Sequence, residues 1–289
     1  MPSRLFRSIL LFAILTMICD CCRATLIVVV IATDGIVIAS DSKVGRMTPT
    51  GIGKQPKLAH KIVVLNDRIA IATVGMGWLQ MGTRPGIAAF DFDSARFLNE
   101  VKNSLPTNAS ESSIERVIVE KLHGTIDALS PYVANGTLNK QNAPGIPYLI
   151  QFIIIWYEHG VPSVRRVTVE CDWNTRKISS PVVKTEYPVP NRPTYINLAF
   201  FGEYDAVIRS VGDPQSPEHR AMEERYPMAK KEIAIDGGKI PPAKSAESIL
   251  FAADFIRLQS EFDSEFVGPP IDFVVLTRAG PPRVSSLPK

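Results

Sequence analysis

The chain has 289 residues, of which 45% are hydrophobic and 21% are charged, as in a globular protein with a core of ordinary size. Its formal net charge at pH 7 is +3, and the first 24 residues carry three arginines and one aspartate, so the rest retains +1. This balance excludes a nucleic-acid-binding protein that works through a basic field. The 18 glycines and 23 prolines are too few and too scattered for a disordered chain.

The first 24 residues have the pattern of a secretion signal peptide. A basic start precedes an apolar stretch, residues 8–18, and the small residues Cys22 and Ala24 follow. The apolar stretch is too short to span a bilayer comfortably. We therefore expect a signal peptide over residues 1–24 and one mature domain over residues 25–289. The expected location is secreted or periplasmic, without membrane contact after cleavage. An uncleaved anchor is the alternative.

Cysteine and histidine offer no metal or disulfide framework. Three of the four cysteines lie in the leader, so Cys171 alone remains and is expected to be a small buried hydrophobe. The four histidines show no metal-ligand spacing and are interpreted as surface or helix residues. We expect neither a metal nor a cofactor.

The first part of the mature chain predicts two successive β-hairpins. The four strands are expected at residues 25–31, 36–40, 61–65 and 68–74. Asp34-Gly35 and Asn66-Asp67 mark the two turns. Residues 45–56, which contain glycines and lysines, predict a loop, and the step at Gly75 is expected to lead toward a helical region.

The remaining elements alternate between groups of helices and groups of strands. Apolar residues at helical spacing predict helices at residues 94–105, 113–133, 202–212, 216–225 and 245–262. Strands are expected at residues 148–157, 163–170, 178–185 and 271–277. This order favours an α+β fold, a four-layer αββα sandwich in which helices flank two stacked antiparallel sheets.

Chemistry-bearing residues gather at the ends of the first strands. Thr25 begins the first strand, Asp41 ends the second and Lys61 begins the third. In adjacent hairpins these strand ends meet at one edge, so the three residues are expected to cluster there. An N-terminal threonine supplies a hydroxyl nucleophile together with its own α-amine as base. A nearby lysine lowers the pKa of acidic protons, and an aspartate keeps that lysine charged. Alternatively, Thr25 is a β-branched strand residue and Asp41 with Lys61 a solvated pair.

Residues 25–75 resemble the start of a proteasome β-type subunit, a member of the N-terminal-nucleophile (Ntn) hydrolases. The stretch Asp34-Gly-Ile-Val-Ile-Ala-Ser-Asp41-Ser is similar to the signature that follows the nucleophile strand in that family. Lys61-Ile and Asp67-Arg-Ile match the next strand pair. The resemblance implies that Thr25 is the nucleophile, that Asp41 and Lys61 are its charged supports, and that the Gly75 N–H is the oxyanion donor.

The rest of the chain is similar to the family only in the order of its elements. The family has an Asp and a Ser-Gly-Gly before its last strand, where this chain reads Asp263-Ser-Glu-Phe-Val-Gly268-Pro-Pro. Asp263 and Ser264 are candidates for those positions. The family places a serine near its third helix, where this chain has Phe201-Gly-Glu-Tyr-Asp205. The chain thus departs from the family at the residues that the resemblance implies for the hydrogen bonds around the α-amine of the nucleophile.

The sequence thus favours a threonine-type hydrolase that cuts peptide or other amide bonds once its leader is removed. Two alternatives stay open: a non-catalytic proteasome-like subunit that serves assembly or binding, and a small-molecule amidase on the same scaffold. The expected partners are a peptide or small amide substrate and further copies of the chain in a homo-oligomeric ring, with no nucleic acid. A monomer is the alternative to the ring.

Overall fold

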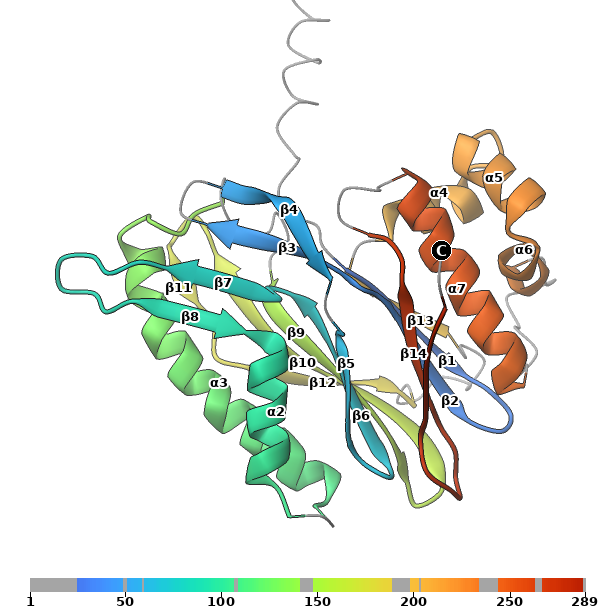
Figure 1. Cartoon of the computed structure of the whole chain (residues 1–289), viewed down its shortest axis with the longest axis horizontal. Helices are drawn as coiled ribbons and strands as arrows, with labels where there is room; N and C mark the ends of the chain where they lie inside the picture. The colour runs from blue at the N-terminus through green and yellow to red at the C-terminus, as the bar shows by residue number, and fades with distance from the viewer. Residues whose placement is uncertain are drawn as a thin grey trace, which may run out of the picture.

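In a computed structural model of the chain, the residues described are 25–48, 51–58, 60–106, 109–140, 148–188, 198–202, 204–233, 244–262 and 267–287. The predicted signal peptide and the candidates Asp263 and Ser264 lie outside these residues. Within the described part, helices and several antiparallel sheets confirm the expected mixed α+β class (Figure 1).

Five strands form the first sheet, in the order β13-β1-β2-β14-β15, and every neighbouring pair is antiparallel. Their bounds are β1 Leu26–Ile31, β2 Ile36–Asp41, β13 Leu198–Gly202, β14 Ile271–Leu276 and β15 Arg283–Leu287. The strands β1, β2 and β14 are fully buried along their length. These three central strands of the first sheet are therefore covered on both faces, whereas the edge strand β15 is largely exposed.

The second sheet has the order β11-β10-β9-β6-β5, with β12 also paired to β10. Its strands are β5 Ile62–Asn66, β6 Ile69–Gly75, β9 Tyr148–Glu158, β10 Val161–Asp172, β11 Lys177–Ile178 and β12 Val182–Tyr187. A third, smaller sheet contains β3 Lys43–Thr48, β4 Gly51–Leu58, β7 Trp78–Met81 and β8 Phe90–Asp93. One parallel pairing, between β3 and β7, joins its two hairpins.

Two groups of helices lie on opposite sides of the strands (Figure 1). One group contains α2 Ser94–Ser104 and α3 Glu111–Ala134. The other contains α4 Asp205–Gly212, α5 Pro217–Arg225, α6 Pro227–Ile233 and α7 Ser245–Phe262. The Asp93 carboxylate caps α2 by accepting from the backbone N–H groups of Ala95 and Arg96.

Three hydrophobic cores fill the spaces between these layers. One core joins the second sheet to α2 and α3, and another joins the first sheet to α4–α7. The third core lies between the two sheets and contains residues of both. Along β1 the side chains alternate, with Leu26, Val28 and Val30 on the helix side and Ile27 and Val29 between the sheets. This layering is compatible with a sandwich of two stacked sheets between helices.

Several predicted elements are confirmed at close to their expected bounds. The helix at 245–262 is α7, the helices at 94–105 and 113–133 are α2 and α3, and the first two hairpins are β1–β2 and β5–β6. The helix expected at 202–212 begins at Asp205, and Gly202 ends strand β13 instead.

Two expectations about connecting segments are wrong. The predicted loop at residues 45–56 is occupied by β3 and β4, and the region after Gly75 enters the strands β7 and β8 before α2 begins. Pairing in the third sheet supplies the hydrogen bonds that hold these glycine-containing segments extended. The single strand expected at 178–185 is divided into β11 and β12, which pair with different parts of β10.

Candidate functional site

The four predicted site residues lie at one end of the two sheets. Thr25 directly precedes β1, Asp41 ends β2, Lys61 directly precedes β5 and Gly75 ends β6. The turns of the hairpins β1–β2, β5–β6 and β14–β15 lie in the lower part of Figure 1, and the candidate residues belong to the opposite strand ends. These strand ends lie at the same end of the molecule but not at one sheet edge, because β1 and β2 belong to the first sheet and β5 and β6 to the second.

Asp41 is the most highly connected side chain of this group. It is 0% exposed, and its Oδ1 accepts a hydrogen bond of 2.8 Å from the backbone N–H of Leu26. Its Oδ2 accepts bonds from Nζ of Lys61, at 2.9 Å, and from the backbone N–H of Lys43, at 3.1 Å. The carboxylate therefore connects the peptide that follows Thr25 to the lysine on the other sheet.

Lys61 is almost completely buried, so its charge depends on its partners. Its side chain is 5% exposed and contacts Asp41. Burial lowers the pKa of the Lys61 ammonium, while the negative charges of Asp41 and Asp272 act in the opposite direction. Burial also raises the pKa of the Asp41 carboxyl, which Lys61 and two backbone N–H groups oppose. The pair is thus isolated from solvent, and each member stabilises the charge of the other.

Thr25 directly precedes β1, one side of which faces the second sheet. Ile27 and Val29, which follow Thr25 at intervals of two residues, belong to the core between the sheets. Thr25 itself is 3% exposed. Its backbone carbonyl packs against Gly202, where an added Cβ would collide with the Thr25 oxygen and would lie 3.2 Å from Val74 Cγ1. Gly202 therefore connects Thr25 to the end of β6.

Gly75 adopts a backbone conformation that favours glycine. Its φ is +87°, and an added Cβ would lie 2.7 Å from the carbonyl oxygen of Leu149. The N–H of Thr73 donates to Lys61 O, and the N–H of Met76 donates to Leu149 O on the other side of β6. Since N–H groups alternate between the two sides of a strand, the Gly75 N–H points toward the Lys61 side.

The structure adds a second carboxylate that the sequence did not reveal. Asp272, in β14, is 5% exposed and accepts a hydrogen bond of 3.1 Å from Ser42 Oγ. Nδ1 of His60 lies 2.7 Å from the same Asp272 oxygen. His60, interpreted from the sequence as a surface residue, is indeed exposed, yet it is also bonded to the site. The sequence predicted the strand at 271–277 that contains Asp272, but it did not predict that this strand lies beside β2.

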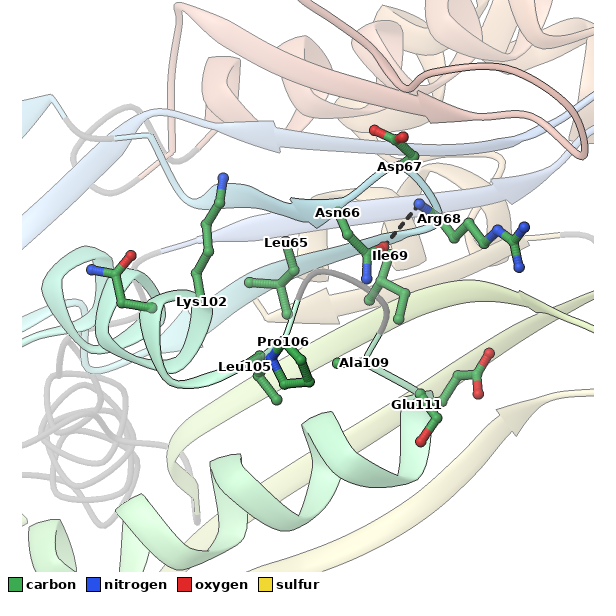
Figure 2. A pocket seen from close by; sticks show the side chains of 12 residues that line it. Leu65, Asn66, Asp67, Arg68, Ile69, Lys102, Leu105, Pro106, Ala109 and Glu111 are labelled. Atoms are coloured by element: carbon green, nitrogen blue, oxygen red, sulfur yellow. Dashed lines mark hydrogen bonds between the residues drawn. The ribbon is translucent and has the colours of Figure 1, made fainter.

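A pocket of about 710 Å³ lies away from these residues (Figure 2). It is formed by the β5–β6 turn and the segment between α2 and α3, with Leu65 and Ile69 on its apolar part and Arg68, Lys102 and Glu111 among its charged residues. The turn is separated from Lys61 by the length of β5, about 16 Å for five residues. The pocket therefore takes no part in the Thr25 site.

No protein-family model matches the chain, and the search of curated proteins finds no relative. The described residues contain no group of three or more His, Cys, Asp or Glu side chains that could hold a metal ion. Within the same part of the chain, every helix is too short or too polar to cross a membrane.

Proposed function

We propose that this chain is a threonine-type amide hydrolase with the Ntn-hydrolase form of the αββα sandwich. Its nucleophile is Thr25, which becomes N-terminal when the preceding residues are removed. The observation that carries the proposal is the buried Asp41 carboxylate, which bonds both the Leu26 N–H beside Thr25 and the Lys61 ammonium. Burying an ion pair costs desolvation energy. A threonine that only begins a strand does not require such a pair next to its peptide bond with Leu26, so the pair is better explained by a chemical role.

The reaction begins with attack of the Thr25 hydroxyl on the carbonyl carbon of an amide. The free α-amine of Thr25 takes the hydroxyl proton as the new C–O bond forms. The tetrahedral intermediate then collapses, the C–N bond breaks and the amine passes that proton to the leaving nitrogen. A water molecule, deprotonated by the α-amine, attacks the resulting ester and releases a carboxylic acid and the regenerated Thr25.

The surrounding residues stabilise the charges of this sequence of steps. The Lys61 ammonium lowers the pKa of the nucleophile and its amine, and Asp41 holds the lysine in place. The Gly75 N–H donates to the oxyanion from the Lys61 side of β6. Each role uses a group that is fixed before substrate binds, which is the condition for efficient electrostatic stabilisation.

The substrate class that fits this chemistry is a peptide or a small amide, hydrolysed outside the cytoplasm. A ring of identical chains would restrict access to the Thr25 edge and make the enzyme selective for unfolded chains or short peptides. Light scattering of the processed protein tests the ring. A single species of about 29 kDa, the mass expected without a 24-residue leader, would show a monomer with an open site for small amides.

The decisive experiment combines processing with covalent labelling. Intact mass and N-terminal sequencing of protein from its native host are expected to give a chain that begins at Thr25. A β-lactone, which acylates reactive hydroxyls, is then expected to modify Thr25, as located by tandem mass spectrometry. A start elsewhere, or a chain that begins at Thr25 but neither reacts nor hydrolyses a panel of peptides and acyl amides, would overturn the proposal.

A non-catalytic binding role is the second candidate. The pocket at the β5–β6 turn favours it, because apolar side chains such as Leu65 and Ile69 and the charged residues Arg68, Lys102 and Glu111 line the same cavity (Figure 2). If binding at this pocket is the function, Arg68→Ala and Lys102→Ala should impair the function of the protein in its host, whereas Thr25→Ala should not. If hydrolysis is the function, Thr25→Ala should impair it, whereas the two pocket variants should not.

A further inference from the structure

Asp272 bonds the two residues that flank the buried pair in sequence. Ser42 directly follows Asp41, and His60 directly precedes Lys61. Both side chains bond the same oxygen of Asp272, Ser42 Oγ at 3.1 Å and His60 Nδ1 at 2.7 Å. A carboxylate only accepts hydrogen bonds, so His60 donates from Nδ1. One atom thus holds together the end of β2 and the segment that leads into β5.

The other oxygen of Asp272 is also occupied. Oδ1 accepts a hydrogen bond from Ser286 Oγ, in the neighbouring strand β15. Asp272 lies opposite Ser40 of β2 in the register of the sheet, and its backbone position is therefore fixed by β2 and β15 on both sides. A buried carboxylate with three side-chain donors is oriented closely, because each donor restricts its rotation.

We propose that Asp272 is a positioning residue: by bonding Ser42 and His60 it holds Lys61 against Asp41, and its negative charge also acts on the Lys61 ammonium. The inference rests on the proposed hydrolase function only for its consequence on rate. Its structural basis is the set of contacts between Asp272, Ser42 and His60. Without Asp272, the buried ammonium would face one carboxylate, and burial would favour its neutral form more strongly.

The charged groups around Lys61 come from several neighbouring elements. Asp41 belongs to β2, Asp272 to β14 and His60 to the segment before β5. Lys43, in β3, donates its backbone N–H to Asp41. After processing, the α-amine of Thr25 adds a titratable group at the start of β1. The negative charge of Asp272 raises the pKa of Lys61 against the effect of burial.

The test measures the titration of Lys61 directly. Protein labelled with ¹³C at lysine Cε is titrated by NMR, and the Lys61 signal is assigned by its loss in Lys61→Arg. In Asp272→Asn the Lys61 transition is expected to move to lower pH, and the basic limb of the pH–rate profile is expected to move with it. At neutral pH and above, kcat/KM is expected to fall about tenfold.

Three matched variants separate charge from structure. Ser286→Ala removes one donor to Asp272 without changing its charge, so the Lys61 transition is expected to stay in place. His60→Ala removes one contact at an exposed position, and His123→Ala, an exposed histidine of α3, is its control. His60→Ala is expected to lower kcat more than His123→Ala does. It also remains informative if Asp272→Asn fails to fold.

The outcomes distinguish this inference from the proposed function. A wild-type protein without amide hydrolysis would overturn the function, while the NMR titration would still report on Asp272. A Lys61 transition that is the same in Asp272→Asn and in wild type would overturn the inference, even in an active enzyme. Equal effects of His60→Ala and His123→Ala on kcat would show that the His60 contact has no positioning role.

Discussion

The Asp41 carboxylate lies 2.9 Å from Nζ of Lys61, with the two side chains 0% and 5% exposed. A buried pair of this kind contributes little net stability when both members are present, because desolvation offsets their attraction. Loss of one member is costly, because it leaves an uncompensated charge in the interior. Single and double substitutions of Asp41 and Lys61 can therefore separate the effect of the pair on stability from its effect on hydrolysis.

We expect Lys61→Met to lower the free energy of unfolding by about 3–5 kcal/mol and to abolish hydrolysis. The double variant Asp41→Asn/Lys61→Met is expected to regain at least half of that stability, since no unpaired charge remains, but no activity. Asp41→Asn alone is expected to retain more activity than Lys61→Met, because aspartate acts through lysine. Urea unfolding and kcat/KM measure the two effects.

The exposed pair between Arg96 and Asp91 is the control for the comparison of the single and double variants of Asp41 and Lys61. Both side chains are about half exposed, and Arg96→Ala is expected to change stability by less than about 1 kcal/mol. If the double variant is as unstable as Lys61→Met, the cost does not come from an unpaired charge. If it hydrolyses amides, Lys61 has no part in the reaction.

Thr25→Ala is expected to abolish hydrolysis while the fold is kept, because the change removes one hydroxyl at the start of a strand. Thr25→Ser is expected to retain part of the activity, since the hydroxyl and the α-amine both remain. Thr185→Ala, at an exposed position of β12, is the control and is expected to leave turnover unchanged. Steady-state kinetics with circular dichroism makes the comparison. Undiminished turnover by Thr25→Ala would eliminate the mechanism.

The sequence predicted those parts of the site that depend on local pattern. Strand ends and turns around Asp34-Gly35 and Asn66-Asp67 indicated that Thr25, Asp41 and Lys61 lie at the same end of their hairpins, but not that the two hairpins belong to different sheets. The contact between His60 and Asp272 joins residues 212 positions apart, and it depends on β14 lying beside β2. No periodicity in either segment encodes that neighbour.

The difference between local pattern and tertiary contact also explains which predicted helices and strands were right and which were wrong. The helix α7 was predicted with its observed bounds because its apolar spacing extends over 18 residues. The strands β3 and β4 contain three glycines and a proline, which indicate a loop when taken alone. Their extended form comes from pairing with each other, and this is a tertiary effect.

Asp34 gives a pH-dependent contribution to stability at the opposite end of β2. Its carboxylate accepts hydrogen bonds from the backbone N–H and the hydroxyl of Ser245, at the start of α7. Burial raises its pKa, but the Ser245 bonds, its own backbone and Arg283 outweigh this effect and place the pKa below 3.8. A lowered pKa in the folded state means stability that is present above pH 3.8 and lost as pH falls through the folded value.

We therefore expect Asp34→Asn to cost about 0.5–1.5 kcal/mol at pH 7 and progressively less as the pH falls below 3.8. Urea unfolding at a series of pH values measures this difference. Asp127→Asn, at an exposed position of α3, is the control and is expected to have no such trend. An Asp34→Asn cost that is constant from pH 7 to pH 3 would contradict the ionic role of the Asp34–Ser245 contact.

Cys171 provides a test of burial and of processing together. Its side chain is 4% exposed, and burial, aided by Asp172, raises the pKa of its thiol to about 11. At pH 8 about one thiol in a thousand is then ionised, and access is blocked as well. Native processed protein is expected to resist iodoacetamide at pH 8, and urea-unfolded protein is expected to gain one label.

Because the sequence has four cysteines and three precede Thr25, a chain that keeps its leader would gain four labels on unfolding. Rapid labelling of the native processed protein would show that Cys171 is not buried, and four labels would leave Thr25 without the free amine that the proposed mechanism requires.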